Sequence, residues 1–255
     1  MQLQVHIGSL EVAAPRAVRF GPFDAANLIR GHLGKELFRA QPELYQRLYN
    51  PEPLSGGPSG FADPPRPIRL ITRHLAGRSF RAGEPIGFQV HLFDASLLPA
   101  LGTSNFRLLQ LDLNAPFAET SQLEIQFLTP TEIRGVPQPD FGPLLARLRD
   151  RLSLLRTFYG DGPLEIDFRG LGERATKVQL LSTRLESMRA SRRSTSQQTL
   201  HPMGGFFGTA RYAGDLTEFL PYLYAGQFTG LGKYTVWGQG EISIPILPAA
   251  TSSLK

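Results

Sequence analysis

The hydrophobic pattern in the second half of the chain changes period, and this change most limits the folds open to it. In residues 122–130 (QLEIQFLTP) every second residue is apolar, with Leu123, Ile125 and Phe127 on one side, as in a half-buried strand. Residues 141–159 then place leucines three and four positions apart, as in a helix that buries one stripe. The sequence therefore predicts a strand followed by an amphipathic helix.

The order of the elements that follow indicates a fold class. Residues 164–168, 176–185 and 204–212 are predicted to be strands, Asp215 opens a short helix, and residues 234–244 form the last strand. The order strand, helix, strand, strand pair, helix, strand is that of a ferredoxin-like unit with one added strand. An RRM shares this topology, but its aromatic-rich RNA-binding signature is missing here.

The first half of the chain is predicted to form a separate unit of similar size. Residues 2–12 alternate as a strand, and a helix is expected from Asp24 to about Arg39. Residues 50–67 contain six prolines and three glycines, a composition that predicts a long loop. Two further stretches, 68–75 and 86–93, have the pattern of strands.

We therefore expect an α+β protein of two tandem ferredoxin-like, RRM-like domains. The first spans residues 1–115, and the second spans residues 116–248 and contains the glycine-rich loop described below. Residues 249–255 are small, polar and close to a proline, so they are expected to form a flexible tail.

Composition excludes several classes of protein. The chain has no cysteine, which removes disulfides, thiol nucleophiles and cysteine-ligated zinc and favours a reducing cytoplasm. Lysine and arginine number 27 against 22 acidic residues, a mild preference for polyanionic partners. No apolar stretch reaches the ~18 residues of a membrane helix, and the first twenty residues do not have the pattern of a signal peptide. We expect a cytoplasmic protein with no membrane partner.

A cluster of glycines near the C-terminus is the most unusual local feature. Five glycines surround Lys233 in GQFTGLGKYTVWGQGE, residues 226–241. The spacing fits neither a Walker P-loop nor a dinucleotide fingerprint, because Tyr234 follows the lysine and Thr235 replaces the third glycine. A loop of backbone N–H donors with one lysine suits a nucleic-acid phosphate, while the plainer alternative is a tight turn that starts a strand. The candidate RNA-binding residues here are Gly230, Gly232, Lys233, Gly238 and Gly240.

This segment also carries a family resemblance. Residues 204–242 resemble the C-terminal signature of the CRISPR-associated repeat-RNA-processing endoribonucleases of the RAMP superfamily, where a glycine-rich loop follows the last helix. FLTPTEIRG (127–135), RRSTSQQ (192–198) and LIRGHLGKELFR (28–39) resemble further segments of that family. One departure is NFRLLQLDLNAPF (105–117), which has no glycine-rich loop at the end of the first domain.

The resemblance implies both a partner and a reaction. The partner would be CRISPR repeat RNA in precursor guide transcripts, cut without metal or cofactor to leave 2′,3′-cyclic phosphate and 5′-OH ends. An alternative is a non-catalytic RAMP subunit that binds guide RNA in a CRISPR effector complex, and a homodimer is compatible with either. The five histidines are scattered, with no HExxH or other metal-ligand spacing.

Three residues of the first domain are the catalytic candidates. His32 lies on the predicted helix where many relatives place their histidine, and imidazole titrates near neutral pH. Lys35, on the same basic face, would stabilise the charge of the phosphorane. Tyr45 would position the ribose 2′-OH or donate to it, with Tyr49 as a near-equal rival. The plainer alternatives are solvated side chains for His32 and Lys35 and packing for Tyr45.

A polar, basic connection, residues 187–202, is the second candidate RNA contact. Arginines separated by serine and glutamine suit phosphate and sugar contacts without reading sequence, although a solvated loop is the alternative. The candidate residues are Arg189, Arg192, Arg193 and His201. The remaining histidines alternate with apolar residues in predicted strands and are expected to be structural; they are His6, His74 and His91.

Overall fold

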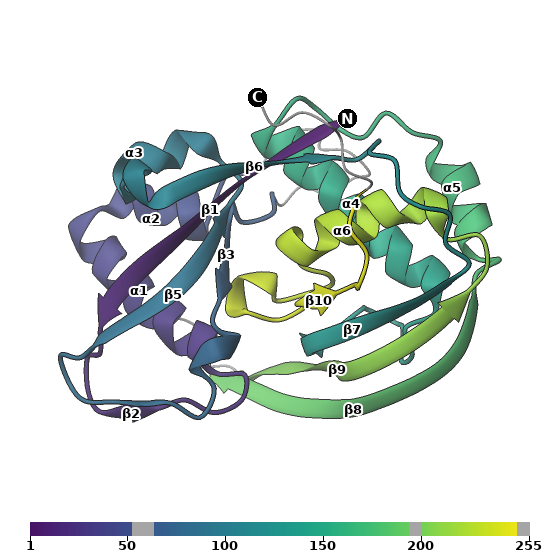
Figure 1. Cartoon of the computed structure of the whole chain (residues 1–255). Coiled ribbons are helices and arrows are strands. Elements are labelled where there is room, and N and C mark those ends of the chain that lie inside the picture. Colours follow the sequence, from purple (N-terminus) through teal and green to yellow (C-terminus); the bar gives the residue numbers. More distant parts are fainter. Residues whose placement is uncertain (53–63, 194–199, 249–255) are drawn as a thin grey trace.

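Two four-stranded antiparallel sheets, each covered by helices, form the protein (Figure 1). The computed structural model describes residues 1–52, 64–193 and 200–248, without the side chains of residues 104 and 189–203. In the first sheet the strand order is β3-β5-β1-β6. Its strands are β1 (Gln2–Ala13), β3 (Ile68–Ile71), β5 (Pro85–Leu92) and β6 (Phe106–Asp112).

Helices α1 (Ala25–Ala40) and α2 (Pro42–Tyr49) follow β1, and the short α3 (Leu98–Leu101) precedes β6. Asp24 stands at the start of α1 as predicted, but its carboxylate accepts the backbone N–H of Gly21 at 2.8 Å instead of capping the helix. Outside the sheet, β2 (Val18–Arg19) and β4 (Ser79–Phe80) pair with each other. Single 3-10 turns complete this half; they are η2 (Arg73–Leu75), η3 (Ala95–Leu97) and η4 (Thr103–Asn105).

The second sheet has the order β10-β7-β9-β8. Its strands are β7 (Gln122–Thr131), β8 (Gln179–Arg193), β9 (Leu200–Ala213) and β10 (Ile242–Ser243). Its helices are α4 (Phe141–Tyr159), α5 (Phe168–Ala175), η5 (Thr217–Phe219), α6 (Leu220–Thr229) and η6 (Thr235–Trp237). In both sheets the first strand lies between the third and fourth, which is the ferredoxin-like order. The predicted fold class, two tandem ferredoxin-like units, is therefore confirmed.

The apolar patterns predicted from the sequence form the core of the second unit. Leu123, Ile125 and Phe127 of β7 are all buried, and the leucine stripe of α4 packs against them in one cluster. The same cluster includes Leu3 and Val5 of β1, which belongs to the first sheet. The two sheets therefore share apolar packing, so the two halves meet across a continuous core instead of a solvated linker.

Three local predictions were wrong. Residues 164–168 are not a strand but lead into α5, where the Asp167 carboxylate accepts the Gly170 N–H at 2.9 Å and so caps the helix. PELYQRLY, for which no element was predicted, forms α2. The polar connection at 187–202 largely continues β8 and β9 as one long hairpin, with Arg192 opposite His201.

The predicted last strand, residues 234–244, shrinks to the two residues of β10. Gly238 and Gly240 have φ of 73° and 70°, left-handed values that an extended strand does not allow, and the segment forms η6 instead. Among the described residues, no helix is both long enough and apolar enough to cross a membrane.

Candidate nucleic-acid interface

The glycine-rich segment, residues 230–240, lies where the two units meet. Gly230, Gly232, Gly238 and Gly240 all have positive φ, between 70° and 80°. A Cβ on Gly232 would overlap the carbonyl oxygen of Glu132, and one on Gly240 would overlap that of Leu231. These glycines therefore allow the close approach of one stretch of backbone to another within the protein.

Most of the amides of this segment are already used. The N–H of Gly230 donates to the Gly226 carbonyl oxygen at 2.8 Å, that of Gly238 to Thr235 at 3.2 Å, and that of Gly240 to Pro130 at 3.0 Å. Gly230 and Gly240 are also buried. The expectation that these three glycines leave bare N–H groups for a phosphate is therefore wrong. Their N–H groups donate to carbonyl oxygens of the protein itself.

Lys233 is the exposed tip of the segment. Its side chain is 44% exposed, and its Nζ lies 2.6 Å from Oε1 of Glu132. The Lys233 N–H also donates to the Glu132 carbonyl oxygen at 3.0 Å, which fixes the backbone of the tip. A surface ion pair of this kind is worth only about 0–1 kcal/mol, so a phosphate can compete with Glu132 for the ammonium group.

The segment packs directly on α1 of the first unit. The Arg30 guanidinium lies 4.4 Å from the centre of the Trp237 ring and 4.6 Å from that of Tyr49. A Cβ on Gly238 would stand 2.6 Å from the Cβ of Ala26. The predicted catalytic helix and the predicted RNA-binding loop therefore share one interface.

A strip of aromatic rings crosses this interface. The Phe38 and Tyr45 ring centres are 5.2 Å apart, those of Tyr45 and Tyr49 are 5.5 Å apart, and those of Trp237 and Tyr234 are 5.7 Å apart. Arg30 joins Tyr49 to Trp237, so the strip runs from the end of α1 to the residue beside Lys233. Burial raises the pKa of Tyr49 to about 12, which keeps it protonated at neutral pH. Half-buried Tyr45 is the more accessible of the two tyrosines.

His32 and Lys35 lie away from the side of α1 that contacts the glycine-rich segment. At 100° per residue, His32 stands roughly 160° and Lys35 roughly 140° around α1 from Arg30, which contacts the glycine-rich segment. His32 is half-buried and Lys35 is exposed. The strip thus contains Tyr45 and ends at Tyr234 beside Lys233, whereas His32 and Lys35 lie on sides of α1 away from the glycine-rich segment.

A buried charged cluster at the end of α6 was not predicted from the sequence. Nη1 of Arg69 donates to the carbonyl oxygens of Gln227 and Phe228, at 2.9 and 3.2 Å, and Nε of Arg151 donates to that of Thr229 at 2.9 Å. Cations suit a helix C-terminus because its last carbonyls carry partial negative charge. Burial lowers the pKa of Arg69 to about 10 and that of Arg151 to about 9, the latter also through repulsion by Arg69. Both groups remain charged at neutral pH.

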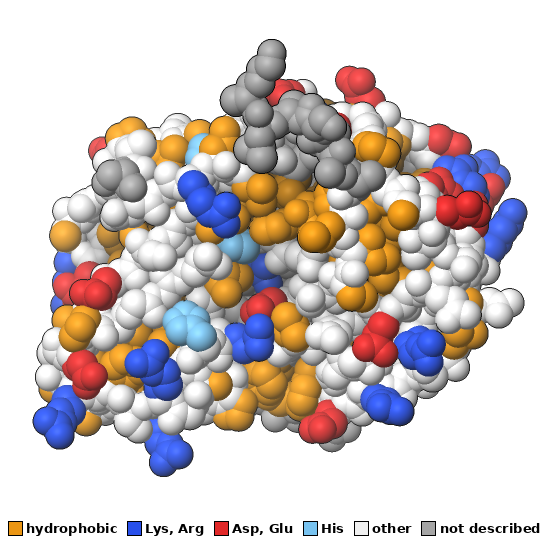
Figure 2. All heavy atoms as spheres, viewed as in Figure 1, with side chains coloured by type: hydrophobic (Ala, Val, Ile, Leu, Met, Phe, Trp, Pro, Cys, Tyr) orange, Lys and Arg blue, Asp and Glu red, His pale blue; other side chains and the backbone are white. Residues whose placement is uncertain are grey.

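Figure 2 shows a hollow between the two halves of the molecule, with histidine and lysine or arginine side chains around it. Near this junction, Arg73 Nε lies 3.3 Å from Oε1 of Glu241, a pair that joins the first unit to the start of β10. The junction is therefore polar at its surface and charged beneath it.

The arginines predicted in the polar connection lie on the long hairpin. Arg189, Arg192 and Arg193 are in β8, and His201 is in β9. Their side chains lie outside the described residues. The hairpin backbone extends well beyond β7, since β8 and β9 remain paired from Gln179 and Ala213 out to Arg193 and Leu200.

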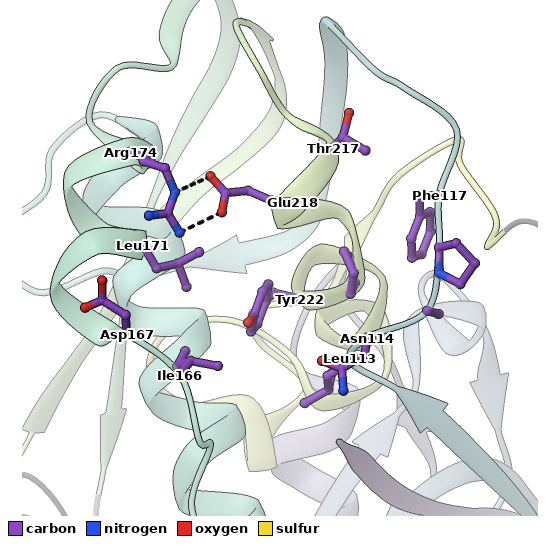
Figure 3. Close-up of a pocket in the computed structure, with 13 residues that line it drawn as sticks. Leu113, Asn114, Phe117, Ile166, Asp167, Leu171, Arg174, Thr217, Glu218 and Tyr222 are labelled. Carbon is purple, nitrogen blue, oxygen red and sulfur yellow. Dashed lines mark hydrogen bonds and ion pairs between the residues drawn. The ribbon is translucent and has the colours of Figure 1, made fainter.

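A separate pocket of about 550 Å³ lies between the chain at 113–117 and helices α5 and α6 (Figure 3). Its charged lining is Arg174, Glu218 and Asp167. Arg174 Nε and Nη2 donate to the two carboxylate oxygens of Glu218 at 2.7 and 2.8 Å. With its one cation so engaged and Asp167 beside it, this pocket does not suit a phosphate. Within the described residues, no group of three or more histidine, aspartate or glutamate side chains could hold a metal ion.

These features define a class: two ferredoxin-like units in tandem, with a glycine-rich segment of the second packed on the first helix of the first. The model of one protein family, the CRISPR-associated endoribonuclease Cas6, matches residues 125–242 of the chain. That range covers the long hairpin, α6 and the glycine-rich segment. The match confirms the family resemblance of the sequence: the chain is similar to Cas6.

Solved structures agree on the fold. Thermus thermophilus Cas6 is 20% identical, with a TM-score of 0.58, over 96% of this chain and 99% of that chain. A second Cas6, solved as a product complex, is 18% identical with a TM-score of 0.53, over 95% and 99%. A chain of a partial Cas6-RT-Cas1–Cas2 complex is 12% identical with a TM-score of 0.57, over 97% of this chain and 47% of that chain. A comparison with curated protein sequences found no match.

Proposed function

We propose that this protein is an endoribonuclease that cuts CRISPR repeat RNA in precursor transcripts, without a metal ion, to give guide RNAs. The observation that carries the proposal is the match to the Cas6 family model over residues 125–242. The tandem ferredoxin-like fold, shared along nearly the whole length of Thermus thermophilus Cas6, supports it. The basic balance of the chain, 27 cationic against 22 acidic residues, suits an RNA substrate.

The protein must fill three roles in this reaction: it transfers protons, stabilises the phosphorane and orients the 2′-OH. The ribose 2′-oxygen forms a bond to the adjacent phosphorus as its proton passes to a base, and the bond from phosphorus to the 5′-oxygen breaks as that oxygen gains a proton. The products are a 2′,3′-cyclic phosphate and a 5′-OH. His32 would move the protons, Lys35 would stabilise the phosphorane, and Tyr45 would orient the 2′-OH.

RNA would be held on the second unit and at the junction. Lys233 offers an exposed ammonium group at the tip of the glycine-rich segment. Gly230, Gly232, Gly238 and Gly240 shape the turn that presents it. The hairpin residues Arg189, Arg192, Arg193 and His201 would add phosphate and sugar contacts along β8 and β9.

The test is cleavage of repeat RNA by purified protein in EDTA. We expect a cyclic-phosphate product from the wild type and a loss of about 10²- to 10⁴-fold in single-turnover rate for His32→Ala. His74→Ala is the matched control, because His74 is an exposed histidine whose Nε2 lies 3.1 Å from the Gly87 carbonyl oxygen, and no catalytic role is proposed for it. Intact RNA with the wild type would overturn the enzymatic proposal. Equal rates for His32→Ala and the wild type would move the chemistry to another residue.

A second function, RNA binding without cleavage in a CRISPR effector complex, is favoured by one observation. His32 and Lys35 lie on sides of α1 that face away from the glycine-rich segment. The proposed catalytic residues are therefore separated from the proposed RNA-binding residue Lys233. A pure binder would hold repeat RNA intact in a tight complex that weakens as salt rises. The EDTA experiment separates the two functions, since it reports the length of the bound RNA.

A further inference from the structure

A short two-stranded ribbon projects from the first unit, outside its sheet. Val18 pairs with Phe80 and Arg19 with Ser79. The same register continues beyond the strands, because the Phe20 N–H donates to the Arg78 carbonyl oxygen at 2.9 Å. At the other end, the Ala14 N–H donates to Glu84 and the Gly83 N–H to Ala14, at 2.9 and 2.8 Å. The ribbon, residues 14–20 with 78–84, is therefore a paired and ordered element.

The inner side of the ribbon is anchored. Phe20 and Phe80 are 2% and 7% exposed, and their rings meet edge to face with centres 5.7 Å apart. The Arg78 guanidinium lies 5.3 Å from the centre of the Phe80 ring, at the edge of this contact. Anchoring of this kind orders the ribbon backbone, so binding a ligand does not have to order it.

The ribbon is strongly basic on its exposed surface, with Arg19 and Arg81 on the outer side and Arg78 at the edge of the inner side. It carries four exposed arginines and a single carboxylate, that of Glu84. Glu84 is bound to the backbone, since its Oε2 accepts the Arg81 N–H at 2.8 Å. Strand alternation places Arg19 and Arg81 on the same side as diagonal neighbours, about 7–8 Å apart. The four arginines are Arg16, Arg19, Arg78 and Arg81.

None of the four arginines forms an ion pair within the described part of the chain. Figure 2 shows separate lysine or arginine side chains projecting over the region where Figure 1 draws β2. Like charges so close repel one another, and a ribbon that served stability alone would gain by losing them. Guanidinium groups suit phosphates in particular, because they bind them in a bidentate manner.

The ribbon also abuts the long hairpin of the second unit. The ring of Phe23, just after the ribbon, lies 5.1 Å from that of Phe207 in β9. In Figure 1 the end of the β8–β9 hairpin reaches below α1 toward β2. Exposed Arg184 of β8 is in register with Thr209, two residues from Phe207. The basic ribbon and the hairpin are thus adjoining parts of one surface.

We propose that the basic ribbon is a further RNA-binding surface, which holds phosphates of single-stranded RNA next to the segment held by the β8–β9 hairpin. The proposal rests on the proposed function, since it needs RNA as the ligand. It adds β2 and β4 of the first unit to the proposed RNA interface. The contact is to backbone phosphates, so it adds affinity without reading sequence.

The experiment measures binding of repeat RNA with single-stranded flanks, over a range of salt concentrations, by wild type and by the double variant Arg19→Gln/Arg81→Gln. We expect the affinity to fall roughly 10-fold near physiological salt, and the slope of log K against log salt to lessen by about 0.7 for each arginine lost. Cleavage at saturating RNA stays at the wild-type rate, because the ribbon lies outside the proposed catalytic residues.

Arg169→Gln is the matched control. Arg169 is an exposed arginine on α5, 90% exposed at its side chain, and it pairs with Glu173 at 2.8 Å. It is expected to bind RNA like the wild type. Equal affinity and equal salt slope for the ribbon variant and the wild type would overturn the ribbon proposal alone. If the wild type binds no repeat RNA, the proposed function itself is contradicted. Thermal unfolding confirms that each variant is folded.

Discussion

His91 Nδ1 lies 2.8 Å from the carbonyl oxygen of Phe228, and this hydrogen bond joins the first sheet to the end of α6. A carbonyl oxygen can only accept, so Nδ1 carries the proton. The imidazole is 5% exposed, and its burial, with the charge of Arg69 nearby, lowers its pKa to about 4. His91 is therefore neutral in the folded protein, with its tautomer fixed by a residue of the other unit.

The burial of His91 predicts a loss of stability in mild acid. An unfolded histidine has a pKa of about 6.5, so between about pH 6.5 and pH 4 the unfolded chain binds a proton that the folded chain does not. The free energy of unfolding is then highest above pH 6.5 and falls as the pH drops toward 4. The contribution of His91 is up to about 3 kcal/mol. Urea denaturation at pH 7.5 and pH 4.5 measures the change.

The variant His91→Gln isolates this contribution, because glutamine can still donate to the Phe228 oxygen but does not titrate. We expect its stability to fall less than that of the wild type over the same range, by about 2–3 kcal/mol. His74→Gln, at an exposed histidine, should keep the wild-type dependence. If His91→Gln and the wild type lose the same amount, the buried imidazole is charged and the argument fails.

Arg69 is expected to be the most costly arginine to remove. It is fully buried and donates to the carbonyl oxygens of Gln227 and Phe228. Arg69→Ala leaves both oxygens without this donor and opens a cavity, so the free energy of unfolding should drop by about 2–4 kcal/mol. Arg73→Ala removes the pair between exposed Arg73 and the largely buried carboxylate of Glu241 and should cost about 1 kcal/mol. Chemical denaturation of the two variants compares them, and equal costs would contradict a structural role for the junction.

Alanine substitutions at two glycines with similar backbone angles distinguish the cost of backbone strain from the cost of steric overlap. Gly240 and Gly77 have φ of 70° and 76°, so alanine is strained at both. A Cβ at Gly240 would overlap the Leu231 carbonyl oxygen, while no atom lies within 4 Å of one at Gly77. We expect Gly77→Ala to cost about 1 kcal/mol and Gly240→Ala roughly 2–4 kcal/mol. Thermal and urea unfolding measure the difference. Equal losses in the free energy of unfolding would mean that the glycine-rich segment shifts to accommodate the added Cβ.

The sequence predicted the parts of the fold that depend on local pattern. Alternation placed β7, and leucines at helical spacing placed α4, because each element buries one face against whatever lies opposite. The predictions failed where partners decide the outcome. Polar residues 187–193 extend as a strand because β9 supplies hydrogen bonds for them, and a serine-rich and arginine-rich stretch carries no apolar pattern to reveal this.

The site was predictable only in part, for the same reason. The glycines around Lys233 indicated a close approach of backbone, but not that the approach would be to Glu132 and Leu231 within the protein. Arg69 and Arg151 meet at α6 from positions far apart in the chain, and each looks like an ordinary arginine beside apolar residues. A pairing of this kind appears only once the two units are packed together.

Trp237 offers a direct test of RNA contact at the glycine-rich segment. It is the single tryptophan of the chain, so its emission reports on this place alone. Its ring is half-buried between the Arg30 guanidinium and the Tyr234 ring, and the Lys233 ammonium group lies 5.9 Å from the centre of that same Tyr234 ring. A phosphate bound by Lys233, or a base stacked on Tyr234, would change the surroundings of the indole.

We therefore expect repeat RNA to change the intensity of Trp237 emission along the same curve that filter binding gives. Lys233→Gln should raise the Kd roughly 5-fold, since one phosphate contact is lost, and should shift the fluorescence curve by the same factor. Arg169→Gln serves as the control with no shift. Full binding of RNA by filter assay with an unchanged emission would show that RNA bypasses the segment, because an RNA strand beside Lys233 cannot leave the neighbouring aromatic contacts untouched.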